Sequence, residues 1–177
     1  MAVVRVALAM IVLAAAPYAV RNWAYAPFEC NRAEKQAEGA TEWAENHSAS
    51  FRGVEVGRQT IERMKRCIEA CPTSVDAYMV VAANDWVLER LPEAIAMYEA
   101  ALHYDRRPEI YLELGLAYLK AGQRERATST LFIWNLFYGQ RTEVIPDLVV
   151  RAEVEARTKS FFAQGSRAQL PAKLRED

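Results

Sequence analysis

A stretch of this sequence recurs at a spacing of 33 residues, and the recurrence restricts the possible folds more than any other feature. Residues 77–95 align with residues 110–128, and each copy reads as two amphipathic helices joined by a short polar turn. Pro92 suits the first turn of a helix, and Gly122 suits the end of one. The matched positions are Tyr78 with Tyr111, Ala82 with Gly115, and Ala94 with Ala127. A repeat of this length is typical of folds in which helix pairs stack on one another.

The composition agrees with a helical fold that has a packed core. Hydrophobic residues make up 52% of the 177-residue chain and charged residues 25%, which excludes wholesale disorder. Seven glycines and seven prolines are few for an all-β chain with many tight turns. The formal net charge of −1 excludes a general nucleic-acid binder, which needs a clustered basic excess.

The recurring small residues predict where the two helices of a pair cross. Only Gly or Ala lets the backbones approach closely, so we expect Ala82 to face Ala94 in the first copy. In the second copy we expect Gly115 to face Ala127. Larger residues three or four positions apart then fill the groove between successive helices: Tyr111, Leu114 and Tyr118.

This pattern resembles the tetratricopeptide repeat, whose helix pairs carry aromatic, small and proline residues at set places. The residues that match are Tyr78, Ala82, Ala94, Tyr98 and Ala101 in the first copy, and Tyr111, Leu114, Gly115, Tyr118 and Ala127 in the second. Half of a preceding unit is visible in residues 58–72, with Met64, Cys67 and Pro72 at the aromatic, small and proline places. The resemblance implies an all-α fold, an α-solenoid of antiparallel helix pairs over residues 58–141.

Three residues depart from the family pattern. In the first copy, Asp85 stands where the family has a tyrosine and Arg106 where it has a proline. In the second copy, Trp134 stands where a small residue is usual. The tryptophan predicts a wider, atypical contact at the end of the array.

Flanking helices are expected to complete the array, because a solenoid needs about three stacked units and modified caps. We expect a linker and a degenerate first helix in residues 29–57, the helix itself over 33–50. Residues 142–177 are expected to form a capping helix, N-capped by Thr142, followed by a polar tail. The side chains predicted to face inward are Ile145, Leu148, Val149 and Ala152.

The N-terminal segment, residues 1–28, is apolar and carries only Arg5 and Arg21 as charged side chains. The uncharged run 6–20 is short for a bilayer span, but aromatic residues and snorkelling arginines at its flanks extend it. The segment predicts a single transmembrane or signal-anchor helix. A cleaved secretory signal and a buried soluble helix are the alternatives, and the flanking charges leave the orientation open.

The sequence contains no recognisable catalytic or cofactor motif, so we expect neither an enzyme nor a bound metal or cofactor. The two histidines, His47 and His103, are far apart in sequence, and His103 suits the end of a helix. Cys67 and Cys71 are four residues apart, which leaves three possibilities open: core packing, a disulfide involving Cys71 or Cys30, and half of a metal site.

The predicted binding surface follows from the resemblance, because such repeats recognise partners through the first helix of each pair. It comprises Asp76, Met79, Ala83 and Trp86 in the first copy, and Glu109, Leu112, Leu116 and Leu119 in the second. Most of these side chains are apolar and need cover, either from the chain's own ends or from a hydrophobic segment of a partner. A second apolar patch comprises Phe132, Ile133, Leu136 and Phe137, which the capping helix buries or a partner or the bilayer covers.

These observations predict a non-catalytic, membrane-anchored repeat protein that acts as a scaffold or accessory subunit in a membrane-associated complex. Its expected partners are other protein subunits and, through residues 1–28, the lipid bilayer, without nucleic acid. Bacterial inner-membrane proteins with one N-terminal helix and a periplasmic repeat domain look similar. The alternative is a soluble periplasmic binding module released by signal cleavage.

Overall fold

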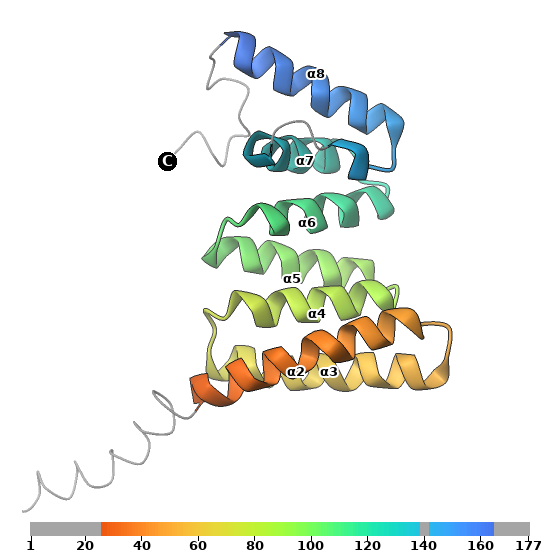
Figure 1. Cartoon of the computed structure of the whole chain (residues 1–177), viewed down its shortest axis with the longest axis vertical. Coiled ribbons are helices and arrows are strands. Elements are labelled where there is room, and N and C mark those ends of the chain that lie inside the picture. Colours follow the sequence, from red (N-terminus) through yellow and green to blue (C-terminus); the bar gives the residue numbers. More distant parts are fainter. Residues whose placement is uncertain (1–25, 139–141, 165–177) are drawn as a thin grey trace, which may run out of the picture. The chain divides into compact units, whose positions relative to one another are not determined.

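A computed structural model of the chain describes residues 26–138 and 142–164 (Figure 1). Every secondary-structure element within these residues is a helix, which confirms the all-α expectation. The chain divides into two compact units, and the division falls between Val87 and Leu88.

The N-terminal unit contains α2 (Ala26–Asn46), α3 (Phe51–Ala70) and α4 (Val75–Val87). Here α2 packs against both α3 and α4, and α3 also packs against α4. The hydroxyl oxygen of Ser50 accepts the backbone N–H of Gly53 at 3.0 Å, which caps the start of α3. The helix therefore begins well before residue 58, where the repeat resemblance starts.

Small side chains form most of the contact between α2 and α3. The buried residues of α2 are Cys30, Ala33, Ala37 and Ala44, and those of α3 are Gly53, Gly57, Thr60, Ile61, Met64 and Cys67. A partly buried polar contact links α4 to α2, because the Asn84 amide donates to the Thr41 hydroxyl at 2.8 Å. The Thr41 hydroxyl donates in turn to the backbone carbonyl of Ala37 at 2.8 Å, so both side chains are engaged.

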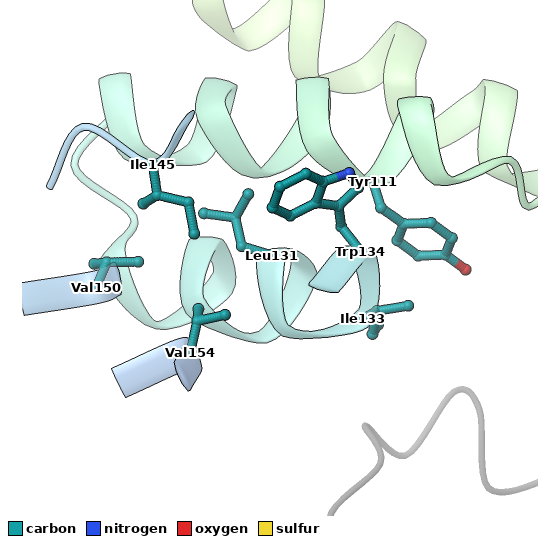
Figure 2. Packing of buried hydrophobic residues seen from close by; sticks show 7 residues of the cluster. All are labelled: Tyr111, Leu131, Ile133, Trp134, Ile145, Val150 and Val154. Atoms are coloured by element: carbon teal, nitrogen blue, oxygen red, sulfur yellow. The ribbon is translucent and has the colours of Figure 1, made fainter. Parts of the chain in front are cut away.

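The C-terminal unit contains α5 (Leu91–Tyr104), α6 (Pro108–Lys120), α7 (Arg124–Tyr138), the short 3-10 helix η2 (Thr142–Val144) and α8 (Leu148–Gln164). Each α-helix of this unit packs against the next one along the chain. A buried apolar cluster joins α6, α7, α8 and the residue after η2 (Figure 2). Its members are Tyr111, Leu131, Ile133, Trp134, Ile145, Val150 and Val154.

The 33-residue spacing of the sequence recurs in the helix bounds. The first residues of α6 and α7 follow those of α4 and α5 by 33 positions, and α6 also ends 33 positions after α4. Matched positions are buried, each within its own unit: Tyr78 and Tyr111, Ala82 and Gly115, Ala94 and Ala127.

The turn after the first helix of each copy also adopts the same unusual conformation. Gly122 has a φ of 73°, and Glu89, at the matched position, has a φ of 59°. In the second copy the N–H of Gly122 donates to the carbonyl of Leu119 at 3.0 Å, and the N–H of Gln123 donates to that of Tyr118 at 2.8 Å. These two bonds form a Schellman motif, in which glycine is favoured because it lacks a Cβ.

Glu89→Gly is therefore expected to stabilise the protein by about 1 kcal/mol, because it relieves a left-handed conformation that an L side chain resists. Gly122→Ala introduces that strain and should cost about 1 kcal/mol. Urea unfolding of the full chain, followed by far-UV circular dichroism, measures both changes. If the two substitutions change the free energy of unfolding in the same direction, the two turns are not equivalent.

The predicted capping helix differs from the observed one in its start and in its inward face. Thr142 begins only the 3-10 turn, and α8 starts at Leu148. Pro146 explains the break, since it lacks an N–H and keeps the preceding residue out of the helical conformation. The true N-cap is Asp147, whose Oδ1 accepts the backbone N–H groups of Val149 at 2.9 Å and Val150 at 3.1 Å.

Moving the cap to Asp147 changes which residues of α8 face the core. Ile145 is buried as predicted, whereas the predicted inward residues Leu148, Val149 and Ala152 are exposed. Val150, Val154 and Thr158 are buried in their place. The Asn135 amide of α7 donates to the Thr158 hydroxyl at 2.9 Å and fixes this face of α8.

The predicted anchor, residues 1–28, lies outside the described residues except for its last three positions. Among the helices of the described part, none has the length and apolar character needed to cross a bilayer. The predicted polar tail after residue 164 also lies outside the described part.

Candidate protein-binding surface

The predicted binding residues of the first copy lie along one side of α4. Asp76, Met79, Ala83 and Trp86 follow one another at spacings of three, four and three residues, which places them on one face of a helix. Asp76 is exposed and the other three are partly buried. This face of the N-terminal unit is therefore accessible in part, and its character is apolar with an acidic residue at the start of the helix.

The matched residues of the second copy form the same kind of stripe on α6. Glu109 is exposed, and Leu112, Leu116 and Leu119 are partly buried. Leu112 and Leu119 pack against the apolar cluster of the C-terminal unit, so part of their surface supports the core. Leu116, between them, is also partly buried.

A polar bridge between three helices holds α6 in place within the C-terminal unit. The Tyr118 hydroxyl donates to Oε1 of Glu99 at 2.5 Å, and Arg126 donates to the same oxygen at 2.5 Å. The Arg126 guanidinium also lies 4.3 Å from the centre of the Tyr118 ring. Burial, reinforced by the hydrogen bond to Glu99, raises the pKa of Tyr118 well above its usual range. The bridge links α6 to α5 and α7.

The second predicted patch is largely inside the C-terminal unit. Phe132 is 1% exposed and Ile133 8% exposed, and the ring of Phe132 lies edge-on to Phe161 of α8 at 6.1 Å. Leu136 is partly buried. Phe137 is 57% exposed and stacks on Tyr111 at 6.1 Å between ring centres. Phe132 and Ile133 are thus buried within the unit that contains the capping helix, and Phe137 is the most exposed of these four residues.

Large apolar side chains on the outer side of α8 were missed by the sequence analysis. Leu148 is 71% exposed, Val149 63% and Phe162 66%. The first two were assigned to the core because the helix was expected to start at Thr142. The Pro146-Asp147 pair is the sequence signal that would have placed the cap correctly.

The histidines are each engaged in local contacts. The His47 ring stacks on Trp43 with ring centres 4.2 Å apart, and its Nδ1 lies 2.9 Å from the Trp43 carbonyl oxygen. His103 lies exposed in the last turn of α5, as predicted, with its ring edge-on to Tyr104. Within residues 26–138 and 142–164, no cluster of three or more His, Cys, Asp or Glu side chains is suited to a metal ion.

Comparison with known proteins does not assign this chain to a family, so the chain is classified here by its fold alone. No protein-family model matches the sequence, and no curated protein gives a significant match. The described residues define an all-helical protein in which the 33-residue spacing recurs in helix bounds, in buried positions and in the conformation of two turns.

Proposed function

We propose that this chain is a non-catalytic scaffold of the tetratricopeptide type, anchored in a membrane and acting as an accessory subunit of a membrane-associated protein complex. The observation that carries the proposal is the recurrence of helix bounds, buried small residues and left-handed turns between α4–α5 and α6–α7. Repeated helix pairs that bury small residues are a general means of presenting an extended binding surface.

The partner binds, in this proposal, along the stripes that begin at Asp76 on α4 and Glu109 on α6. Each stripe places apolar side chains at helical spacing behind one acidic side chain. Such a surface fits the apolar face of a helix or an extended hydrophobic segment from another protein. Leu116 contributes most to the free energy of binding on α6, because its neighbours Leu112 and Leu119 are already packed against the core.

The anchor and the compartment are part of the same proposal. Residues 1–28 insert in the bilayer, and the helices after them lie on the periplasmic side of a bacterial inner membrane. An anchor confines the helical units to the membrane surface and raises their effective concentration toward membrane-bound partners.

Leu116→Ala is expected to reduce the recovery of the partner at least about tenfold, because a central apolar contact contributes about 1.4 kcal/mol or more. The full chain, carrying an affinity tag, is purified from carbonate-washed and detergent-solubilised membranes, and co-purifying proteins are quantified by mass spectrometry. Recovery of the chain itself in the washed membranes tests the anchor.

Leu148→Ala is the matched control, since it removes the same atoms from a leucine that is 71% exposed on α8 of the same unit. The control variant should recover the partner like the parent chain, and both variants should keep the parent's helical circular dichroism. If Leu116→Ala recovers as much partner as the parent chain, the assignment of the binding surface is refuted. If only Leu148→Ala loses the partner, the binding surface lies on α8 instead.

A further inference from the structure

Three cysteines gather where the start of α2 meets the end of α3. The Cys30 thiol donates to the backbone carbonyl of Cys67, with 3.7 Å between sulfur and oxygen. The backbone N–H of Cys71 donates to the same oxygen at 2.7 Å. The Cys30 thiol also lies close enough to Cys67 and to Cys71 for both to influence its pKa. None of the three is in a disulfide bond in the structure.

Neighbouring polar contacts keep these two chain segments in register. The Ser74 hydroxyl donates to the Glu34 carboxylate, one turn beyond Cys30 on α2. Arg63 of α3 donates to the side-chain oxygen of Gln36 at 2.7 Å. The proximity of Cys30 to the end of α3 is therefore supported on both sides of the cysteine cluster.

We propose that Cys30 and Cys71 form a disulfide bond that joins the start of α2 to the end of α3, with Cys67 remaining a buried free thiol. Cys71 is partly exposed, whereas Cys67 is buried, so Cys71 is the α3 thiol that an oxidant reaches. Cys71 is also the C-cap of α3, where the chain leaves the helix and enters a turn that the N–H of Ser74 closes on the Cys71 carbonyl at 3.0 Å.

The reaction needs an oxidant that is itself a disulfide, either a small molecule such as oxidised glutathione or a protein disulfide. The Cys71 thiolate attacks one oxidant sulfur, which forms a mixed disulfide and releases the first oxidant thiol. The Cys30 thiolate then attacks the sulfur of Cys71 and releases the second. The chain loses two protons and two electrons in total, and the oxidant disulfide becomes two thiols.

The environments of the two thiols favour this order of events. Burial, with smaller contributions from the neighbouring Cys67, raises the pKa of the Cys30 thiol to about 12, so it is a poor first nucleophile. The pKa of Cys71 is also raised by burial, but its partial exposure gives an oxidant access. The inference does not depend on the proposed scaffold function, because it concerns the N-terminal unit alone.

The test is to equilibrate the purified full chain with a glutathione redox buffer, quench it with acid, alkylate the free thiols and map the disulfides by mass spectrometry. Cleavage after Glu69 separates Cys67 from Cys71, so that the two possible partners of Cys30 are distinguished. We expect Cys30 linked to Cys71, and Cys67 alkylated. Linkage of Cys30 to Cys67, or alkylation of all three cysteines under strongly oxidising buffer, would overturn the proposal.

Variants give an independent readout through thermal unfolding. Oxidation should raise the melting temperature of the parent chain and of Cys67→Ala by about 10 °C, because the bond closes a long loop of the unfolded chain. Cys71→Ala and Cys30→Ala should show no such rise. If oxidation raises the melting temperature of Cys71→Ala as much as that of the parent, Cys30 and Cys71 are not the bonded pair. If oxidation leaves the melting temperature of the parent unchanged, no stabilising disulfide forms.

Discussion

Trp134→Ala is expected to lower the free energy of unfolding of the C-terminal unit by about 3–5 kcal/mol. Trp134 is 3% exposed and belongs to the apolar cluster that joins α6, α7 and α8 (Figure 2). The first copy carries Ala101 at the matched position, so the substitution returns the repeat to its usual small residue. The loss is large because the close-packed cluster around the buried indole cannot collapse fully onto the space that it leaves.

Hydrogen exchange of the full chain, resolved by peptide mass spectrometry, separates this effect from a general loss of structure. Amides of α6, α7 and α8 should exchange faster in Trp134→Ala, whereas those of α2 and α3 should keep their protection. Trp43→Ala is the matched control, because Trp43 is only partly buried and stacks on the exposed His47. A cost for Trp134→Ala no larger than that of the control would contradict the role of the tryptophan in stabilising the apolar cluster.

Gly115→Ala is expected to destabilise the C-terminal unit by about 1–2 kcal/mol, although alanine is the better helix former by about 1 kcal/mol. A Cβ at this position would lie 2.5 Å from Cγ and 2.6 Å from Cδ2 of Leu131. Leu131 is fully buried within the apolar cluster, so its side chain cannot shift without disturbing packed neighbours. The overpacking cost therefore exceeds the gain in helix propensity.

The control for this substitution is Gly39→Ala on α2, where an added Cβ meets nothing within 4 Å. Alanine there should stabilise the protein by about 0.5–1 kcal/mol, since only the helix propensity changes. The midpoints of urea unfolding of the two variants should therefore shift in opposite directions. A stabilising Gly115→Ala would show that α6 and α7 do not approach as closely as described. A double-mutant cycle with Leu131→Ala should reveal a coupling above about 0.5 kcal/mol.

The positions of the four helices α4 to α7 could be predicted from sequence because their constraint is periodic and local. The 33-residue spacing located α4, α5, α6 and α7, and it identified Ala82 and Gly115 as buried small residues. It placed the close approach of Gly115 at Ala127, whereas the contact described is with Leu131, one helical turn further along α7. The 33-residue spacing alone does not determine how one helix is rotated about its axis relative to the next.

The register of α8 could not be recovered from apolar periodicity alone. The run from Ile145 to Val150 contains more apolar residues than one helix face can bury, so several inward faces were compatible with it. Pro146 and the cap at Asp147 select the one observed. On α6, the sequence could not show that Leu112 and Leu119 support the core, because that depends on α7 and α8, which pack there.

The most direct test of the scaffold account places a photo-reactive amino acid at Leu116 of the full chain, expressed in the membranes in which it functions. We expect irradiation to link the chain to one discrete protein. The same group at Glu125, exposed at the start of α7, should give no such product. Cross-linking of the same protein from Glu125 but not from Leu116, or no product from Leu116 in a correctly folded chain, would contradict the account.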